Sequence, residues 1–408
     1  MSAGVSERTV PVPEPDLTPG EMLARAEAMR PLLLDEQAAT EERGYYSEGI
    51  HEEFRRAGFY RILQPRRYGG YEFDLPAFAR VIMSVARGCP SSGWCLCLAA
   101  GHALNTASLF SEQAQADAFG PDGEFRAPSR GTPLGTAVPV DGGWLVNGTW
   151  DYCSGAPYGT HFLPVALESR DDPTSVVLAL LPREQWTMLD DWGEVLGMRG
   201  SGSHSIAVED ALVPEHFVVR ENLLDVDVTN GTPGYRLHGN AMYAGRTLGF
   251  FYVEIVSIVV GTARAALDEY ESILRTRNTY TPPIVPRFQS HDFQRNFGLA
   301  LANVDAAESV VLHSAETFME LCRRGVEGGE PFSANEDMRL YTRLQQAMRI
   351  SWEAVDLLFR TGGTSGAKNG QRLQRYYRDL AMARTQFAAQ YERSAEWLAR
   401  GYFGLPRF

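Results

Sequence analysis

The periodicity of apolar residues changes twice along this chain of 408 residues, and the two changes constrain its fold more than any single motif. From about residue 18 to 124, apolar residues recur every three or four positions, as along one face of a helix. From 125 to 235 they stand in short runs that end at turn residues, as in β-strands. From 236 to 408 the helical period returns. The sequence therefore predicts a mainly α-helical protein with a central β-domain, a barrel or a sandwich, between two helical domains.

Two details refine this prediction. The dipeptide Gly142-Gly143 after Asp141 separates two alternating runs, which indicates a β-hairpin. In the last domain, four amphipathic segments of more than twenty residues predict an antiparallel four-helix bundle, at 250–277, 292–324, 337–361 and 373–401. The first of them is apolar around most of its circumference and is expected to be the most buried.

Composition narrows the class of protein. Residues 1–17 are rich in proline and lack an apolar core, so we expect a disordered leader and no signal peptide. A net charge of −13 argues against nucleic-acid binding, and the longest apolar run is too short to span a membrane. The five cysteines have no metal-ligand spacing and are expected to be buried free thiols in the cytoplasm. No spacing of His, Cys and carboxylates predicts a metal site, and no Gly-rich motif predicts a Rossmann fold.

Four segments, at 61–94, 101–103, 150–155 and 197–216, resemble in this order the flavin-dependent monooxygenases that share the acyl-CoA dehydrogenase fold. These are the oxygenase components of two-component systems, such as the hydroxylases of p-hydroxyphenylacetate, steroid-derived phenols and polyketide aromatics. The resemblance implies FADH₂ or FMNH₂ delivered by a separate flavin reductase, and addition of O₂ at the flavin C4a position. It also implies transfer of the distal oxygen to an aromatic small molecule, and a homotetramer or homodimer.

The same resemblance places the flavin ring against the loop at 150–155 and near the loop at 198–204. Trp150 and Tyr152 are expected to pack on the ring, while Ser154 and nearby amides hydrogen-bond to its edge. Arg199 either fixes its loop, makes a structural salt bridge or contacts substrate. The expected contacts from the two loops are Trp150, Tyr152, Cys153, Ser154, Gly155, Arg199, Gly200, Ser201 and Ser203.

A flavin phosphate needs cationic side chains or helix N-termini. In the family an arginine near the end of the first bundle helix serves this purpose across the subunit interface, which points here to Arg275 or Arg277, with Gln289 nearby. A glycine-rich turn between the last two bundle helices is expected to approach the neighbouring subunit's cofactor, through Gly362, Gly363 and Thr364.

Catalysis is assigned to His102 and Ser154. His102 matches a histidine that lies beside flavin and substrate in the family; the alternative is a histidine that only fills the core. His204 is a weaker candidate. The expected substrate contacts are Trp94, His102, Tyr158, Gln386 and Phe387.

The chain departs from its relatives at the catalytic base. Alignment on Arg378-Asp379 places Phe387 at the carboxylate of acyl-CoA dehydrogenases, and Gln386 at the histidine of phenol hydroxylases. This disfavours thioester dehydrogenation, which needs a carboxylate. It leaves a substrate that needs no such base, for instance an amine, an indole-like ring or an acidic polyketide phenol. The alternatives are an amine or amino-sugar N-oxygenase, an acyl-CoA dehydrogenase, and an inactive binding protein of this fold.

Overall fold

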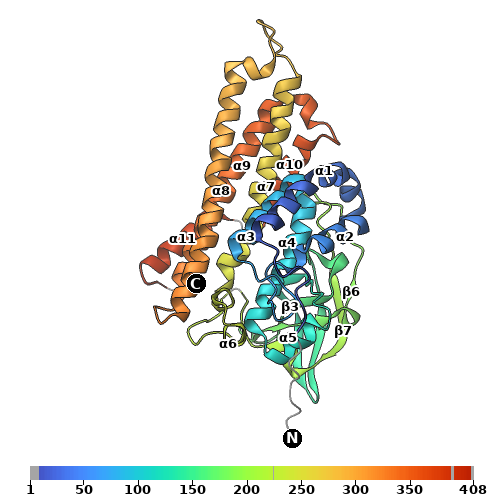
Figure 1. Cartoon of the computed structure of the whole chain (residues 1–408), viewed down its shortest axis with the longest axis vertical. Coiled ribbons are helices and arrows are strands. Elements are labelled where there is room, and N and C mark those ends of the chain that lie inside the picture. Colours follow the sequence, from blue (N-terminus) through green and yellow to red (C-terminus); the bar gives the residue numbers. More distant parts are fainter. Residues whose placement is uncertain (1–8, 224, 387–389, 406–408) are drawn as a thin grey trace.

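The computed structural model describes residues 9–223, 225–386 and 390–405. Helices from both ends of the chain lie above and on one side of a sheet formed by its middle part, and the longest helices extend away from that sheet (Figure 1). The predicted order of a helical domain, a β-domain and long C-terminal helices is confirmed.

The N-terminal domain is built around one completely buried helix. Nearly every residue of α4 is buried, because α1 and α3, α7 and the β-domain cover it on different sides. The helix begins at Pro90: Cys89 precedes it without a side-chain cap, and Ser91 lies inside the helix. Ser111 caps the following helix through the Ala114 amide. The helices are α1 (Pro19–Arg43), α2 (Glu48–Ala57), α3 (Leu75–Gly88), α4 (Pro90–Leu109) and α5 (Glu112–Phe119).

The segment before α1 is more ordered than the sequence predicted. From residue 9 onward it lies against the domain: Val10 is buried and forms a parallel bridge with Tyr68. Glu14 forms an ion pair of 2.6 Å with Arg25 of α1. The prolines favour an extended chain, and these two contacts hold that extended chain in place, so disorder was the wrong expectation for residues 9–17.

The middle domain is an eight-stranded sheet with strand order β6-β7-β2-β1-β3-β4-β8, in which β5 also pairs with β3. The predicted hairpin joins β1 and β2, with Val140 opposite Gly143. The pairing of β1 with β3 is parallel, while the other pairings are antiparallel. The strands are β1 (Ser129–Val140), β2 (Gly143–Trp150), β3 (His161–Leu167), β4 (Val176–Ala179), β5 (Leu181–Pro182), β6 (Thr187–Met188), β7 (Ile206–Val213) and β8 (Val218–Val219).

The C-terminal domain differs from the prediction in its last helix. Three long helices form where expected, but the fourth segment is divided into α10 and α11, with a turn at 384–386. The two parts pack differently, because α10 packs on both α7 and α9 while the main contact of α11 is with α9. The helices are α6 (Pro233–His238), α7 (Thr247–Thr276), α8 (His291–Val326), α9 (Ala334–Gly362), α10 (Arg372–Ala383) and α11 (Tyr391–Tyr402).

Helix α7 is the core of this domain, as its sequence predicted. Within the described residues it is the one helix long and apolar enough to cross a membrane, yet 83% of its most apolar window is buried inside the protein. It packs on α3, α4, α8, α9 and α10, so its apolar surface is covered by other helices.

The contact between α4 and α7 contains a buried carboxyl group. Glu254 of α7 is 1% exposed, and neither of its carboxyl oxygens has a hydrogen-bond partner. A Cβ on Gly101 of α4 would lie 1.7 Å from its Oε1, so a larger residue at 101 would require the Glu254 side chain to move. Burial raises the pKa of Glu254 far above its usual value, which keeps the carboxyl group neutral.

Candidate active site

Two loops of the β-domain meet at a chain of buried hydroxyl groups. The Ser154 Oγ lies 2.7 Å from Ser203 Oγ, which lies 2.6 Å from Ser201 Oγ. The indole Nε1 of Trp94, in α4, donates to Ser154 Oγ at 3.0 Å. The predicted residues of the two loops are therefore brought together, and they join the helix that carries His102.

The loop after β2 holds its shape through an unusual backbone. Tyr152 has a φ of 55°, in the left-handed region that non-glycine residues seldom adopt. Gly155 has a φ of 89°, and a Cβ there would lie 2.9 Å from Ala99 Cβ of α4. The Cys153 amide donates to the His204 carbonyl at 3.1 Å, which ties this loop to the second one. Glycine at 155 is required because the loop lies directly on α4.

The second loop is held by three separate elements. The Met198 amide donates to Asp379 Oδ1 of α10 at 2.6 Å, and the Gly202 amide donates to the Gly44 carbonyl at 2.8 Å. The Gly200 amide donates to Ser91 Oγ of α4 at 3.3 Å. A loop of glycine and serine is thus fixed by long-range contacts.

Several residues predicted to contact flavin have other roles in this structure. Trp150 lies in the core of the sheet, where its Nε1 donates to the Val165 carbonyl at 2.8 Å. Cys153 is a buried thiol whose pKa is raised by burial. Arg199 donates to the Val195 carbonyl at 2.7 Å and lies 3.7 Å from Glu41, so it fixes its own loop. Tyr152 is exposed, edge-on to Trp192.

His102 is positioned as a neutral hydrogen-bond acceptor. Its Nδ1 lies 2.7 Å from the Ala127 carbonyl, which can only accept, so Nδ1 carries the proton and the lone pair of the neutral ring is on Nε2. The Leu98 carbonyl also interacts with the ring. Burial lowers the pKa of His102 to about 4, so the imidazole is uncharged near neutral pH. Its ring contacts Phe251 of α7 edge-on.

Tyr158 does not join this group. It stacks on His51 at 4.1 Å between ring centroids, and its hydroxyl donates to the Tyr46 carbonyl. His51 also belongs to the one group of possible metal ligands among the described residues, with Glu48 and Glu52. Its Nδ1 is already within 2.9 Å of the Tyr60 hydroxyl, and burial lowers its pKa to about 4.

His204 is buried beside the hydroxyl chain. Neither of its ring nitrogens has a hydrogen-bond partner, and the nearest carboxylate, Asp191, lies 3.9 Å from Nδ1. Burial lowers the pKa of His204.

The predicted phosphate contacts gather at the other end of the C-terminal helices, where α7 meets α8 and α9 meets α10 (Figure 1). Arg277 donates to Ser365, which follows Thr364 in the glycine-rich turn. Arg275 instead pairs with Glu271 of its own helix, and Gln289 is exposed. Gly363 has a φ of 94°, and Gly362 accepts from Arg287 at 2.9 Å.

Sequence reasoning missed Arg287, which is buried and holds the α9–α10 turn against the α7–α8 connection. Its Nε donates to the Asn278 carbonyl, and its guanidinium lies over the rings of Tyr280 and Phe293. Among the described residues, the structure records no contact between the residues predicted to bind the flavin phosphate and the three serines Ser154, Ser201 and Ser203 of the same subunit.

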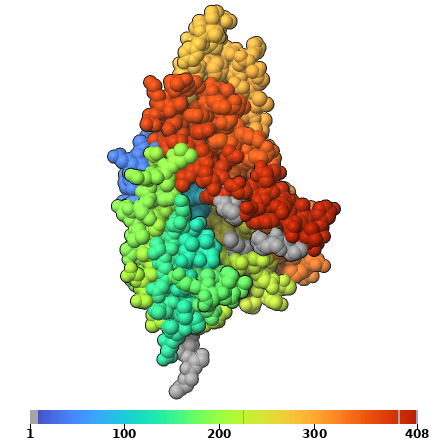
Figure 2. Space-filling model, turned by 180° about the vertical axis from the view of Figure 1, so that it is seen from behind, coloured from blue at the N-terminus to red at the C-terminus, as the bar shows by residue number. Residues whose placement is uncertain are grey.

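Figure 2 shows a hollow between the β-domain, in green, and the C-terminal helices, in red. Gln386 is half-buried in the turn after α10. Phe387 lies outside the described residues.

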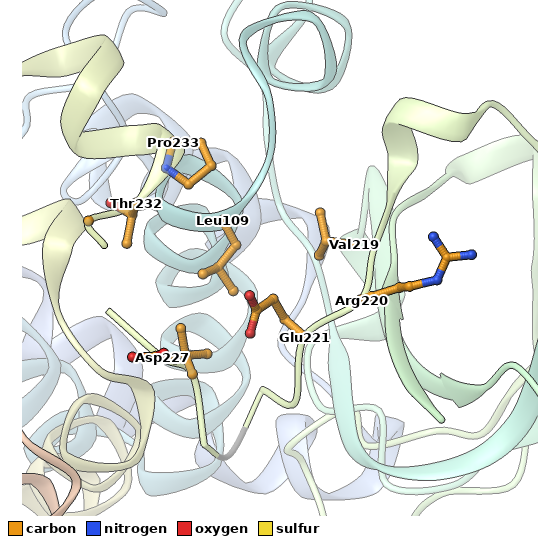
Figure 3. Close-up of a pocket in the computed structure, with 9 residues that line it drawn as sticks. Leu109, Val219, Arg220, Glu221, Asp227, Thr232 and Pro233 are labelled. Carbon is orange, nitrogen blue, oxygen red and sulfur yellow. The ribbon is translucent and has the colours of Figure 1, made fainter. Parts of the chain in front are cut away.

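A separate pocket of about 200 Å³ lies beside the end of α4 (Figure 3). Glu221 points toward Leu109 there, while Arg220 points away and pairs with Glu168 at 3.0 Å. None of the predicted site residues lines this pocket.

The residues at the two loops fit the edge of a flavin ring. That edge alternates hydrogen-bond acceptors with a donor, and the hydroxyls of Ser154, Ser201 and Ser203 can act as either. His204 adds buried nitrogens that have no partner. Left-handed backbone at Tyr152 and Met198, held by distant contacts, is the kind of strain that is concentrated at binding sites.

Comparison with known proteins identifies the family. The acyl-CoA dehydrogenase N-terminal domain matches residues 24–122, and the acyl-CoA dehydrogenase C-terminal domain matches residues 253–391. The oxygenase subunit HsaA of a flavin-dependent monooxygenase from Rhodococcus jostii (strain RHA1) is 30% identical over 397 residues, 94% of this chain and 98% of the relative. The oxygenase component of the FADH(2)-dependent resorcinol hydroxylase of Rhizobium sp. (strain MTP-10005) is 26% identical over 86% of each chain. The crystal structure of 3-HSA hydroxylase from Rhodococcus sp. RHA1 matches with a TM-score of 0.85 at 28% identity, over 95% of this chain and 97% of that one.

The fold and the buried loops define a flavoprotein of the acyl-CoA dehydrogenase fold. Within that class, the chain belongs to the oxygenase components of two-component flavin-dependent monooxygenases. It is an enzyme that uses reduced flavin and O₂, and it acts on a small molecule with a separate flavin reductase. The predicted class of enzyme and cofactor are confirmed.

Proposed function

We propose that this enzyme hydroxylates an aromatic substrate that carries a hydroxyl or ring N–H group, which His102 orients. The observation that supports this most directly is the placement of two functions on one buried helix. Trp94, which donates to Ser154, and His102 are eight residues apart on α4, a rise of about 12 Å. This distance is long enough to separate a flavin ring at the three serines from an aromatic substrate beside His102.

The reduced flavin, when bound, supplies with O₂ the oxygen atom that is transferred. The chain's own residues bind, orient and exclude water. The Ser154 and Ser203 hydroxyls hold the ring edge, and Gly155 lets the loop lie flat on α4. His102 Nε2 accepts the hydrogen bond of the substrate and so fixes which ring carbon faces the flavin.

A pKa of about 4 makes His102 a weak base. It therefore orients a phenol by hydrogen bonding and removes little of its proton in the ground state. Gln386 has no useful basicity. Both properties favour an electron-rich or already acidic ring, such as a dihydroxylated or fused-ring phenol. The resorcinol hydroxylase among the relatives supports this substrate class.

The quaternary structure we propose is a homotetramer or homodimer in the cytoplasm. Large apolar side chains are exposed around the α7–α8 connection, namely Tyr280, Ile284, Phe288 and Leu299. Burying them against a second copy would place Arg277 and Gly363 of one subunit beside the flavin phosphate of the other. Five buried free thiols suit a reducing compartment.

The test is to supply FADH₂ or FMNH₂ anaerobically, admit O₂, and measure product and hydrogen peroxide for a panel of simple phenols, fused-ring phenols, indoles and amines. Product from phenols at the expense of peroxide supports the proposal. Product only from amines would assign the enzyme to N-oxygenation instead. Light scattering of the purified protein decides the oligomeric state.

A further inference from the structure

Helix α10 is fixed to the N-terminal domain by buried polar contacts. Arg375 and Arg378 both pair with Glu41 of α1, at 2.8 and 2.6 Å. Gln37 of α1 donates to the Tyr376 hydroxyl at 3.0 Å. The helix is thus a rigid support to which other segments can be attached.

The loop at 197–203 is attached to this helix at two consecutive residues. Gly197 lies so close to α10 that a Cβ would be 2.2 Å from the Arg378 carbonyl oxygen. The next amide, of Met198, donates to Asp379 Oδ1 at 2.6 Å. Arg378 also donates to the Leu196 carbonyl at 2.8 Å, so both members of the Arg378-Asp379 pair hold the loop.

Asp379 has the features of a residue kept for its effect on geometry. It is 2% exposed, and its Oδ2 has no hydrogen-bond partner. A buried carboxylate oxygen without a partner destabilises the folded state, so stability alone does not explain this residue. Its partner Met198 has a φ of 52°, a strained conformation that the bond to Asp379 compensates. Four residues beyond Met198 the loop reaches Gly202, and then Ser203, which bonds to Ser154.

We infer that Asp379 is a positioning residue: it fixes the loop at 197–203 so that Ser201 and Ser203 hold Ser154 in the geometry that binds reduced flavin. The inference rests on the proposed role of the two loops. The same helix α10 leads directly into the turn that contains Gln386, so loop and turn share one support.

The experiment uses four variants of the full-length enzyme. Asp379→Ala removes the acceptor, whereas Asp379→Asn retains a carbonyl oxygen that can accept from Met198. Gly197→Ala forces the loop off α10 and leaves Asp379 intact. Gln37→Met is the control for α10 packing in general. It removes the contacts of Gln37 with Tyr376 and Arg375, but leaves the ion pairs with Glu41 that hold the helix next to the loop.

The first measurement is hydrogen exchange of the flavin-free protein, and the second is titration with FADH₂ and FMNH₂ under anaerobic conditions. We expect Asp379→Ala and Gly197→Ala to exchange faster at 198–203 and to bind reduced flavin roughly tenfold more weakly. Asp379→Asn should restore most of both properties. Gln37→Met should lower the melting temperature without changing either.

Unchanged exchange and unchanged flavin affinity in Asp379→Ala and Gly197→Ala would overturn the inference, as would equal losses in Gln37→Met. If Asp379→Ala does not fold, Gly197→Ala decides the same question. Failure of the wild type to bind reduced flavin would instead refute the proposed function, so the two failures are distinguishable.

Discussion

Ser154 and Ser203 are 49 positions apart in the sequence, yet their hydroxyl oxygens lie 2.7 Å from each other in a buried site. Each comes from a different loop, and each loop is tied to helices of another domain through Gly155 and Met198. The geometry of this one hydrogen bond therefore depends on how all three domains pack. For an enzyme that must keep a reactive oxygen species away from water, such dependence makes the site sensitive to any loosening between domains.

The first prediction concerns Ser154. Replacing it by alanine leaves the Trp94 N–H and Ser203 without their shared partner, which should cost about 1–3 kcal/mol of stability. The larger effect is on coupling: we expect more hydrogen peroxide and less product for each reduced flavin consumed. Ser257→Ala is the control, because Ser257 is equally buried but bonds only to its own helix. Equal coupling in both variants would remove Ser154 from the site.

The second prediction separates substrate orientation from folding at His102. His102→Gln should bind reduced flavin normally but lower the product yield by about 10²-fold, near the lower end of acid–base effects. His161→Gln is the matched control, because burial also lowers the pKa of His161 to about 4 and it lies on β3. If both variants lose stability and neither changes the yield, His102 only fills the core.

The same histidine predicts a pH profile. Because the pKa of His102 is about 4, it stays neutral and able to accept a hydrogen bond at all pH values from about 5.5 upward. The dependence of kcat/KM on pH between 5.5 and 8 should therefore contain no ionisation from His102, and His102→Gln should leave its shape unchanged. A rising limb near pH 6.5 that disappears in the variant would contradict this assignment.

The fourth prediction concerns folding and Asp379. Burial raises the pKa of Asp379 to about 6 in the folded protein from a reference value of 3.8, although the hydrogen bond from Met198 and the charge of Arg378 both lower it. Folding thus favours the protonated form of Asp379. Its contribution to the free energy of unfolding is therefore largest below about pH 4 and is lost as the pH rises through 6. The free energy of unfolding of the wild type, minus that of Asp379→Asn, should fall by up to roughly 3 kcal/mol from pH 4 to 7. Urea unfolding at equal protein concentration measures it; a difference that rises with pH would show that the charged form is favoured.

The fifth prediction concerns the end of the C-terminal helices where α7 meets α8 and α9 meets α10. Arg277→Ala should weaken reduced-flavin binding if this arginine reaches a phosphate across a subunit interface, and Arg275→Ala should not. Arg275 pairs with Glu271 on an exposed helix surface, whereas Arg277 meets the glycine-rich turn at Ser365. A larger loss for FADH₂ than for FMNH₂ would locate the contact at the part of the cofactor that only FAD has. Identical affinities for both variants would remove Arg277 from the cofactor site.

The architecture was predictable because it depends on local patterns. The change from helical period to alternation, and the Gly142-Gly143 turn, are properties of neighbouring residues. The division of the last helix was not, because residues 373–401 contain no proline or internal glycine before 401. The packing of α10 on α7 and α9, and of α11 on α9, joins residues far apart in the sequence, which a local helix preference does not report.

The site was predictable only in part. A resemblance could point to Ser154 and His102, but the contact of Met198 with Asp379 joins residues 181 positions apart. Trp150 illustrates the opposite case. Its position predicted packing against the flavin ring, yet its indole fills the space left by Gly135 and Gly148 inside the sheet. Only the three-dimensional packing decides between these uses of a tryptophan.

The pairing of Glu254 with Gly101 has a consequence for how this enzyme can change. The carboxyl group occupies the space that a Cβ at 101 would need, so the two positions can vary only in a fixed order. A substitution at 101 alone collides with Glu254, whereas shortening residue 254 first opens the space. Random libraries of single substitutions should therefore recover fewer tolerated changes at 101 than libraries in which residue 254 has been shortened. Libraries built on Glu254→Ala should recover alanine or serine at 101. In a protein that has acquired both substitutions, reversion of residue 254 to glutamate should be tolerated only after residue 101 has reverted to glycine.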